Sequence, residues 1–377
     1  MILMLNCCLF TATTDITGTR IPLSFGAQPI NSTDLCANSM TYSISGDAGL
    51  FLKGLLVTRV MPSFYILLLL ISLPLNALAL VTFTCKIKEK KPTVIYMSNL
   101  ACVDLLFTLL LPLKIHYHLN GSVWVFGEVA CRVLSAAFYC YMYCSILLMM
   151  CMSVDRLLAV VFPIVSLTWR TTRNSVYVCA LVWLLALAGT VPLLSITQTL
   201  NIKDVGITCH DALCSNDLDK MYMNLFSILS CLYFFLPLVI TLACYSSIIY
   251  ALSVKSGRLA TSSSSTSNKR RRAVIMTIAT MIEFVVCFAA TNAILLYHCV
   301  ILITRGTRGE GNASYMPYML AVCAGSSSVF LDPLLYYYGS SQCRQQIRSV
   351  FWWKKTQLQS YRTTKFSTTT ELSLRIE

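Results

Sequence analysis

Three acidic residues stand in stretches of the sequence that are otherwise almost entirely apolar. Asp104 lies in "LACVDLLF", Asp155 precedes Arg156 in "SVDRLLAV", and Asp332 precedes Pro333 in "LDPLLYYY". A charged group at the centre of a bilayer costs about 2.5–3.5 kcal/mol on insertion scales, so it is expected to face protein rather than lipid. Asp104 is therefore predicted to be an ion- or proton-linked switch. A neutral, hydrogen-bonded acid with a structural role is the alternative.

Other polar residues in the apolar runs are predicted to act with these acids. Asn76, Ser145 and Asp332 are the expected polar neighbours of Asp104. Arg156 ends a helix near lipid, where an arginine can also simply extend its guanidinium to the interface.

The elements that must position these groups are membrane-spanning helices. Hydrophobic residues make up 56% of the 377 residues and charged residues only 12%, whereas globular chains carry about 25% charged residues. Seven apolar runs provide the roughly 20 residues that a spanning helix needs, and the last but one is interrupted only by Glu283. The chain is thus predicted to be an all-α membrane protein, a seven-transmembrane helix bundle. The helices are expected at 58–85, 92–118, 127–161, 172–196, 219–253, 269–303 and 313–338.

The basic residues orient this bundle in the membrane. Most of the 29 Lys and Arg residues fall in the loops between helices 1 and 2, 3 and 4, and 5 and 6, and in the C-terminal tail. Short loops rich in Lys and Arg stay in the cytoplasm, which predicts an extracellular N-terminus in a multi-pass protein of the plasma membrane. Sequons at Asn31, Asn120 and Asn312 would then be glycosylated. The net charge of +13 indicates contact with anionic lipid in the bilayer, and no nucleic acid is expected as a partner.

The chain divides into three regions. Residues 1–57 are predicted to form the extracellular N-terminus, and their first 14 residues resemble the core of a signal peptide. Residues 58–338 form the transmembrane domain. Residues 339–377 contain a short amphipathic eighth helix and then a cytoplasmic tail rich in Ser and Thr.

Other classes of membrane protein fit the sequence less well. The chain has no internal repeat of the kind that builds inverted-repeat transporters. A light-driven pump needs a Schiff-base lysine in the seventh helix, and residues 313–338 contain none. Catalytic residues and a metal site are not expected either, because the histidines at 116, 118, 210 and 298 have neither metal-binding nor catalytic-triad spacing.

Motifs along the helices, taken in order, resemble a rhodopsin-like (class A) G-protein-coupled receptor. They are Asn76, Asp104, "WVFG" at 124–127 ahead of Cys131, Asp155-Arg156, Trp183, Pro237, Tyr245 and "DPLLY" at 332–336. Within that class the chain is similar to the proteinase-activated receptors of the thrombin-receptor type. The stretches that carry this likeness are "KPTVIYMSNLACVDLLF" (91–107), "AAFYCYMYCSILLM" (136–149), "LTWRT" (167–171), "TCHDAL" (208–213), "CFAATN" (287–292) and "DPLLYYYGSSQCR" (332–344).

The resemblance implies a tethered agonist. In that family a trypsin-like serine protease cuts the N-terminus after a basic residue, which here implies cleavage after Arg20. The agonist would comprise Ile21, Pro22, Leu23, Ser24, Phe25 and Gly26, although Pro22 stands where the family often has an aromatic residue. The residues expected to bind it are His210, Asp211, His298, Tyr315 and Tyr318. Asp211 is expected to pair with the new ammonium group, and the alternative is that it is merely a solvated loop acid. A receptor for a diffusible peptide, nucleotide or lipid is the alternative.

A tether is also physically reasonable. About 36 residues separate Ile21 from the first helix, and a flexible chain of that length spans roughly 35 Å. A linked ligand at that distance has an effective concentration near the millimolar range. A short peptide of weak intrinsic affinity could therefore occupy its site.

The resemblance also implies the remaining sites and partners. A disulfide between Cys131 and Cys209 is expected, and a second between Cys36 and Cys214 is proposed. The activation switch would consist of Asn76, Asp104, Ser145, Asp155, Arg156, Tyr245, Asp332, Pro333 and Tyr336, with a sodium ion near Asp104 and no other cofactor. The partners implied are a heterotrimeric G protein that signals through calcium, a receptor kinase and arrestin. Cys343 is the candidate for lipidation, and blood coagulation is the process that the thrombin-receptor likeness suggests.

Besides Pro22, three positions in the helices depart from the family's pattern. Tyr141 replaces a small polar residue of the sodium pocket, and Ala290 stands where the sixth helix usually has a hinge proline. Arg270 leaves Arg156 without an acidic partner in the sixth helix, so Arg156 is expected to rely on Asp155.

Overall fold

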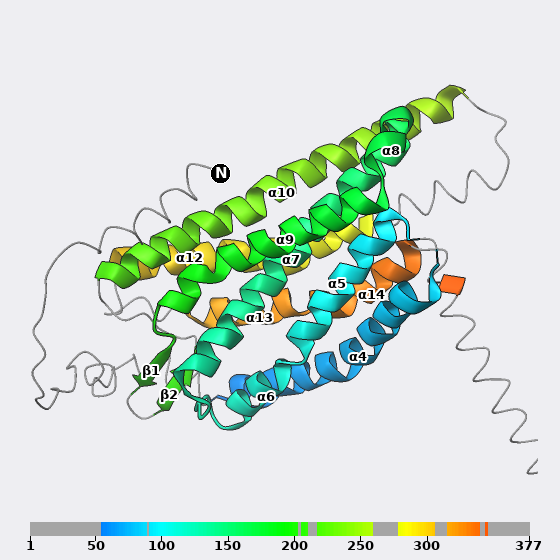
Figure 1. The fold of residues 1–377 in the computed structure, drawn as a ribbon. Coiled ribbons are helices and arrows are strands. Elements are labelled where there is room, and N and C mark those ends of the chain that lie inside the picture. Colours follow the sequence, from blue (N-terminus) through cyan, green and yellow to red (C-terminus); the bar gives the residue numbers. More distant parts are fainter. Residues whose placement is uncertain are drawn as a thin grey trace, which may run out of the picture. The chain divides into compact units, whose positions relative to one another are not determined.

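The computed structural model confirms the predicted fold class. It describes residues 54–88, 90–202, 205–209, 217–258, 278–305, 315–339 and 344–345. That part of the chain contains seven helices long and apolar enough to cross a membrane, and Figure 1 shows them side by side. The predicted amphipathic eighth helix and the tail lie almost entirely outside the described residues.

The first four spanning helices begin and end close to the predicted positions. The first consists of η1 (Leu56–Val60), α4 (Met61–Val81) and η2 (Thr82–Lys86), where η marks π-helical segments. The second is divided into α5 (Pro92–Thr108) and α6 (Leu111–Leu119). The third is α7 (Gly127–Val160), and the short α8 (Pro163–Trp169) joins it to the fourth, α9 (Thr172–Ser195).

The last three spanning helices complete the bundle. The fifth is α10 (Asp217–Arg258). The sixth runs from residue 278 through η3 (Phe284–Ala289) into α12 (Ala290–Arg305). The seventh is divided at Ser327 into α13 (Tyr315–Ser326) and α14 (Ser328–Gly339).

Local sequence explains several helix boundaries. Pro92 and Pro163 occupy the first turns of α5 and α8, where the missing N–H costs nothing because it has no intrahelical partner. The Thr171 hydroxyl caps α9 by accepting a hydrogen bond from the Asn174 N–H at 3.2 Å. Pro112 follows the break between α5 and α6, since proline cannot continue the preceding hydrogen-bond ladder.

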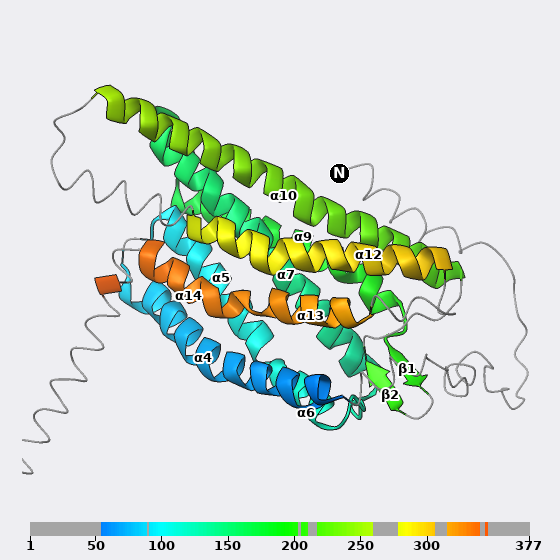
Figure 2. The same ribbon diagram turned by 180° about the vertical axis from the view of Figure 1, so that it is seen from behind.

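The third helix, α7, is the centre of the bundle. Within its spanning window 72% of the residues are buried, against 28% in the window of α10. It packs against α5, α9 and α10, while α4 contacts α5, α6 and α14, and α12 contacts α10 and α13. These contacts close a ring around α7, and Figure 2 shows α12, α13 and α14 on the side away from α9.

Burial is distributed as expected for a protein whose solvent is lipid. Leu67 and Leu70 of α4 are 56% and 66% exposed, whereas Ser72 and Asn76 of the same helix are completely buried. Apolar side chains can face hydrocarbon at no cost, but polar side chains need partners inside the bundle.

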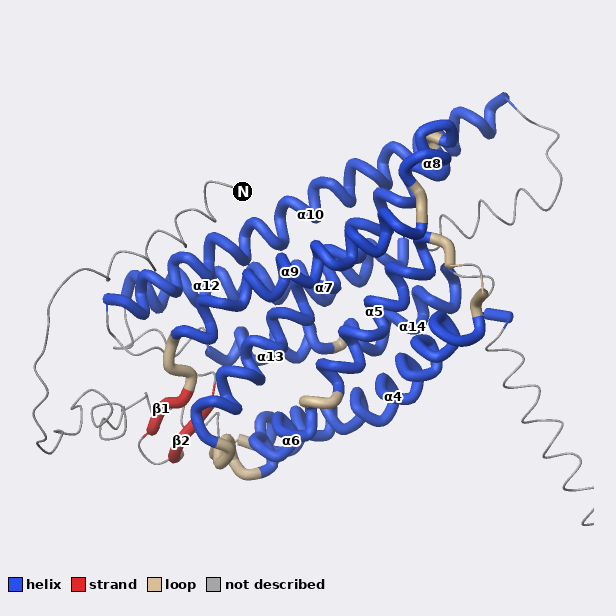
Figure 3. Tube along the Cα trace, viewed as in Figure 1, coloured by secondary structure: helices blue, strands red, loops and turns tan. Residues whose placement is uncertain are grey.

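An antiparallel hairpin lies at one end of the bundle, and Figure 3 shows its strands in red. Strands β1 (Thr199–Ile202) and β2 (Gly206–Cys209) pair with Thr199 opposite Cys209 and Ile202 opposite Gly206. Gly206 has a φ of 112°, a conformation that L-residues with a side chain rarely adopt. This hairpin is the element that brings Cys209 to the start of α7.

Candidate functional site

Much of the predicted agonist-binding machinery lies outside the described residues. This group comprises the cleavage site and agonist at 20–26, Cys36, His210, Asp211, Cys214, Cys343 and the sequons at Asn31 and Asn312. His298 and Tyr315 lie in α12 and α13, but their side chains are not described. The structure does place Asn120, which follows α6 and is exposed, and Tyr318.

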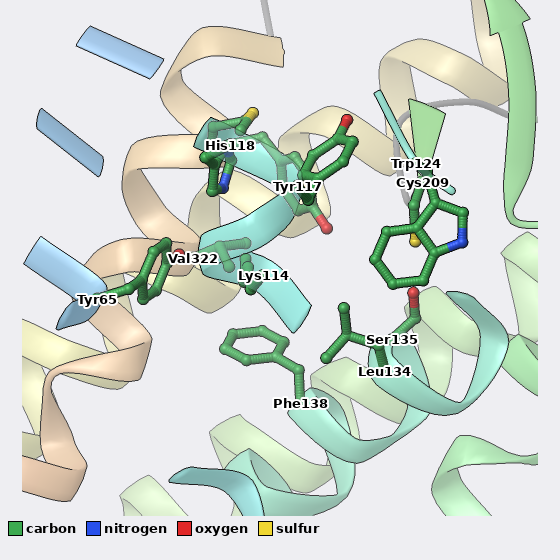
Figure 4. A pocket seen from close by; sticks show the side chains of 12 residues that line it. Tyr65, Lys114, Tyr117, His118, Trp124, Leu134, Ser135, Phe138, Cys209 and Val322 are labelled. Atoms are coloured by element: carbon green, nitrogen blue, oxygen red, sulfur yellow. The ribbon is translucent and has the colours of Figure 1, made fainter. Parts of the chain in front are cut away.

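A cavity of about 50 Å³ lies among α4, α6, α7 and α13, beneath the hairpin (Figure 4). That volume holds a few water molecules or one side chain, and it is too small for a hexapeptide. Aromatic and aliphatic groups form most of its wall. The lining residues are Tyr65, Lys114, Tyr117, His118, Trp124, Leu134, Ser135, Phe138, Cys209, Tyr318, Met319 and Val322.

Three polar side chains face this largely apolar cavity. The Lys114 ammonium lies 5.1 Å from the ring centroid of Tyr65 and 5.4 Å from that of Phe138, within the range of cation–π attraction. His118 stacks on Tyr65 with centroids 5.8 Å apart, and both of its ring nitrogens are buried without a hydrogen-bond partner among the described residues. The Ser135 hydroxyl is likewise buried without a hydrogen-bond partner among the described residues. A ligand that fills the cavity would therefore find polar groups to bind.

Tyr318 is the predicted ligand-binding residue that the structure brings to this cavity. Its side chain is 4% exposed, and its hydroxyl lies 3.1 Å from the Tyr139 hydroxyl of α7. Tyr318 thus connects the cavity with the central helix.

The predicted disulfide between Cys131 and Cys209 is confirmed, and it fixes the hairpin to α7. The loop before α7 adds a backbone hydrogen bond from the Trp124 N–H to the Ile207 carbonyl at 2.6 Å. The Trp124 indole N–H donates to the Gly127 carbonyl at 2.7 Å, and its ring packs against the disulfide. Trp124, part of the "WVFG" motif, therefore holds the wall of the cavity.

Glu128 forms a second connection between α7 and the hairpin, through hydrogen bonds. Its carboxylate accepts hydrogen bonds from the Gln198 N–H at 2.8 Å, from the Thr199 N–H at 2.9 Å and from the Thr199 hydroxyl. The Arg132 Nε donates to the same carboxylate at 2.6 Å, and the Arg132 Nη1 donates to the Leu194 carbonyl at 3.1 Å. One acid thus joins the end of α9, the start of β1 and the first turn of α7.

Tyrosines of α7 connect it to the helices around it. The Tyr141 hydroxyl is hydrogen-bonded to the Ser328 hydroxyl at 2.5 Å and donates to the Gly325 carbonyl at 3.3 Å, while its ring stacks on Phe107. The Tyr143 hydroxyl lies 2.8 Å from the Ser230 hydroxyl of α10. Tyr141 therefore bridges to the seventh helix.

Among the predicted switch residues of the bundle interior, the structure shows a direct contact between Asp104 and Tyr336. Asp104 is completely buried and its Oδ2 accepts a hydrogen bond from the Tyr336 hydroxyl at 3.0 Å. Asp332 of α14 is also completely buried, and both of its carboxylate oxygens lack a hydrogen-bond partner among the described residues. The Asn76 amide instead donates to the Val329 carbonyl at 2.9 Å, which ties α4 to α14. The Asp104 Oδ1 and the Ser145 hydroxyl are buried without partners among the described residues.

These free oxygens fit a sodium ion, which favours oxygen ligands. Asp104 supplies a carboxylate oxygen and Ser145 a hydroxyl oxygen, and neither atom is bound to another described group. The hydroxyl of Tyr141, which takes the place of a small polar residue, is engaged by α13 and α14.

The sixth helix has a π-helical segment immediately before Ala290, where the family pattern has a proline. It spans Phe284–Ala289, and such segments are one of the known causes of a helix bend. The Thr291 hydroxyl lies 2.6 Å from the Cys287 carbonyl and 2.7 Å from the Ala321 carbonyl of α13. A π-helical segment, rather than a proline, thus supplies the irregularity in this helix.

The end of α7 that lies away from the hairpin corrects one expectation. Arg156 was expected to rely on Asp155, but the Asp155 carboxylate is held by Arg170 and by the Thr93 hydroxyl, which donates at 2.8 Å. The Nη1 of Arg156 is buried without a partner among the described residues. Tyr245, another predicted switch residue, accepts a hydrogen bond from the Ser153 hydroxyl at 2.8 Å. Arg170, which lies between α8 and α9, instead donates to both oxygens of the Asp155 carboxylate.

Sequence reasoning missed Glu128, Tyr139 and Arg170 as members of the site. Tyr139 and Arg170 lie in the stretches "AAFYCYMYCSILLM" and "LTWRT", but those stretches were used only to support the family resemblance, and no role was predicted for either residue. Glu128 follows "WVFG" and is the sole acid of the first turn of α7, which is the one signal that could have identified it.

Comparison with known proteins agrees with this arrangement. The family model described as 7 transmembrane receptor (rhodopsin family) matches residues 75–336. Proteinase-activated receptor 1 of Homo sapiens is 42% identical over 328 residues, which cover 87% of this chain and 75% of that protein. The Xenopus laevis receptor of the same name is 41% identical over 314 residues, covering 83% and 71%. Proteinase-activated receptor 2 of Mus musculus is 36% identical over 309 residues, covering 82% and 75%.

The seven-helix bundle and the family match define a G-protein-coupled receptor of the rhodopsin family. It is a multi-pass protein of the plasma membrane that couples to G proteins, and it is a receptor and not an enzyme. Within that class the chain belongs to the proteinase-activated receptors.

Proposed function

We propose that a trypsin-like serine protease activates this receptor by cleaving after Arg20, so that the segment beginning at Ile21 becomes a tethered agonist. The observation that best supports this proposal is the 42% identity to proteinase-activated receptor 1 over 87% of the chain. Arg20 is the first basic residue, and the next, Lys53, is close to the first helix. Arg20 is therefore the basic site of the N-terminal segment that a protease can reach well away from the membrane.

The agonist binds at the end of the bundle that carries the hairpin, with the N-terminus extracellular. The new ammonium group of Ile21 pairs with Asp211, and the cavity accepts one side chain of the agonist. The aromatic wall and the partnerless polar atoms of His118 and Ser135 support this assignment. Lys114 gives the cavity a positive charge, which disfavours the ammonium group there and favours an uncharged side chain.

The signal passes through the bundle as a two-state switch. Agonist binding favours the state in which the inner ends of the third, fifth and sixth helices open to the G protein, with Arg156, Tyr245 and Tyr336 stabilising it. A sodium ion held by Asp104 and Ser145 would supply positive charge that stabilises the other state. Phosphorylation of the Ser/Thr-rich tail by a receptor kinase would add the charge that arrestin recognises.

A protease panel with a calcium readout tests this function. Cells that express the wild-type receptor are expected to respond to at least one trypsin-like protease. Cells that express Arg20→Ala should lose that response yet still respond to the synthetic peptide IPLSFG. Asp211→Ala is expected to weaken both the protease and the peptide response.

A diffusible agonist gives a different pattern in the same experiment. If Arg20→Ala responds to proteases as wild type does, cleavage at Arg20 is not the activating event. If the receptor is cut at Arg20 but gives no calcium response to either the protease or the peptide, the result would instead favour a diffusible peptide, nucleotide or lipid as the agonist.

A further inference from the structure

The imidazole of His118 is a polar group of the cavity wall that neighbouring aromatic rings hold in place. No part of the His118 side chain is exposed. Its ring is nearly parallel to that of Tyr65, and the Tyr117 ring packs against it with centroids 5.1 Å apart. Figure 4 shows the His118 ring at the wall of the cavity, close to Tyr65 and Val322. These contacts fix the directions in which the ring nitrogens point.

The unsatisfied nitrogens of His118 define the kind of group that the cavity binds. Both are buried without a hydrogen-bond partner among the described residues, whereas buried polar atoms are normally paired with protein, water or a ligand. A neutral imidazole has one N–H donor and one acceptor nitrogen, and which nitrogen is which depends on the tautomer. A hydroxyl can donate or accept, so it can bond to either nitrogen in either tautomer.

The agonist segment contains one side chain with this chemistry. In "IPLSFG", residues 21–26, Ser24 has the only polar side chain. Its hydroxymethyl group is small, as a cavity of about 50 Å³ requires. The side chains of Leu23 and Phe25 are larger and have no hydrogen-bonding atom, so either of them would leave the His118 nitrogens unsatisfied in the complex. Ser24 is therefore the side chain of the segment that matches the cavity.

The length of the agonist allows Ser24 to reach the cavity while Ile21 binds elsewhere. Cys209 lines the cavity, and Asp211, the proposed partner of the Ile21 ammonium group, is two residues further along the chain. A fully extended chain spans about 3.3–3.6 Å per residue, so Ser24 can lie up to roughly 10 Å from Ile21. The two contacts are therefore compatible with each other.

We propose that the Ser24 side chain of the agonist enters this cavity and that its hydroxyl forms a hydrogen bond with a ring nitrogen of His118. His118 is then a specificity-determining residue, which selects a hydroxyl at the fourth position of the agonist. The inference rests on the proposed function, since it names the side chain that the cavity accepts.

A double-mutant cycle between peptide and receptor tests the contact. Calcium responses to the synthetic peptides IPLSFG and IPLAFG are measured in cells that express the full-length receptor at matched surface levels. On the wild type, IPLAFG should be at least fivefold less potent than IPLSFG, because the hydroxyl is missing. On His118→Phe the two peptides should agree within twofold, because the partner of that hydroxyl is missing. His118→Gln, whose amide can donate and accept, should regain at least a twofold preference for IPLSFG.

The peptide IPASFG, which truncates Leu23, is the matched control. It should lose potency by the same factor on the wild type and on His118→Phe. Equal potency of IPLSFG and IPLAFG on the wild type would overturn the proposal without any receptor variant. A fivefold loss for IPLAFG that persists on His118→Phe would also overturn it, because the hydroxyl would then bind another group. If His118→Phe does not reach the surface, the wild-type comparison and His118→Gln decide.

Failure of the proposed function gives a different result. A wild-type receptor that responds to neither protease nor peptide would refute the tethered agonist itself, and this contact with it. If the wild type responds to protease but not to free peptide, the cycle is repeated within the chain. Protease-treated Ser24→Ala should then respond less than the wild type, and Ser24→Ala/His118→Phe should match His118→Phe. A further loss in the double variant would contradict the contact.

Discussion

Arg170 binds the carboxylate of Asp155 with two hydrogen bonds, Nε to Oδ1 at 2.7 Å and Nη2 to Oδ2 at 2.9 Å. This paired geometry is the strongest that an arginine and a carboxylate can form, and it raises the pKa of the Arg170 guanidinium above its usual value. The pair joins the segment between α8 and α9 to the C-terminal end of α7. Its consequence is that Arg156, the next residue after Asp155, is left without that partner.

Replacing Arg170 is expected to weaken signalling. In Arg170→Ala the Asp155 carboxylate keeps the Thr93 hydroxyl as its donor among the described residues, and the adjacent Arg156, which already interacts with it electrostatically, becomes a candidate partner. Pairing of Asp155 with Arg156 would hold Arg156 away from the G protein, so we expect at least a threefold lower maximal response to agonist. G-protein activation at matched surface expression measures this.

Arg173→Ala is the control for the Arg170 experiment. Arg173 is exposed, and its guanidinium donates to the hydroxyl of Tyr177, one helix turn further on, and lies over the Tyr177 ring. Removing it should leave signalling within the error of the assay. Equal responses from the two variants would show that the Asp155 pair does not govern Arg156.

Glu128 is expected to stabilise the end of the bundle that carries the hairpin. In Glu128→Ala the backbone N–H groups of Gln198 and Thr199 lose their acceptor, and hydrogen bonds to a charged group contribute about 1.5–3 kcal/mol each to stability. Because the Glu128 side chain is 28% exposed, water recovers part of this, and we expect a loss of about 1–3 kcal/mol in total. The thermal stability of purified receptor should fall accordingly, with Glu128→Gln intermediate.

Val129→Ala is the matched control for Glu128. Val129 is the following residue and is 75% exposed, so its truncation removes no protein contact of consequence. A Glu128→Ala receptor as stable as Val129→Ala would mean that the disulfide alone fixes the hairpin.

Much of this architecture could be predicted from the sequence, and the reason is the membrane. An apolar run long enough to span a bilayer has few possible structures other than a helix. The free-energy cost of a carboxylate in lipid likewise required Asp104 to face the interior of the bundle. The position of the π-helical segment was not predictable, because it depends on how the sixth helix packs on α13 rather than on any local residue. Arg170 was missed for a similar reason. Its partner is 15 residues away, on another helix, and an arginine in a loop between spanning helices ordinarily contacts lipid or water.

Gly325 is expected to tolerate no larger residue, because it lies against the sixth helix. A Cβ atom at this position would lie 2.9 Å from the Thr291 Oγ1 and 3.4 Å from the Phe138 ring. Thr291 cannot easily turn away, since its hydroxyl is bound to the Ala321 carbonyl. Gly325→Ala should therefore lower stability by about 1–3 kcal/mol, a typical cost of overpacking a core.

A double-mutant cycle separates this clash from a general loss of stability. Thr291→Ala alone loses the hydroxyl and should also be less stable. In Gly325→Ala/Thr291→Ala the clash is gone, so the double variant should be more stable than the sum of the two single losses predicts. Strict additivity of the melting-temperature changes would contradict the contact.

His118 is expected to serve agonist binding at the expense of stability. Its imidazole is completely buried with two partnerless nitrogens, and a buried polar atom without a partner costs about 1–3 kcal/mol. His118→Phe keeps the stacking on Tyr65 and removes the polar atoms, so the unliganded receptor should melt at a higher temperature. The same change should reduce the potency of the IPLSFG peptide at least fivefold, because a polar contact in the cavity is lost. His116→Phe, an exposed change in the same helix, should alter neither quantity. A lower melting temperature for His118→Phe would show that water in the cavity satisfies the imidazole.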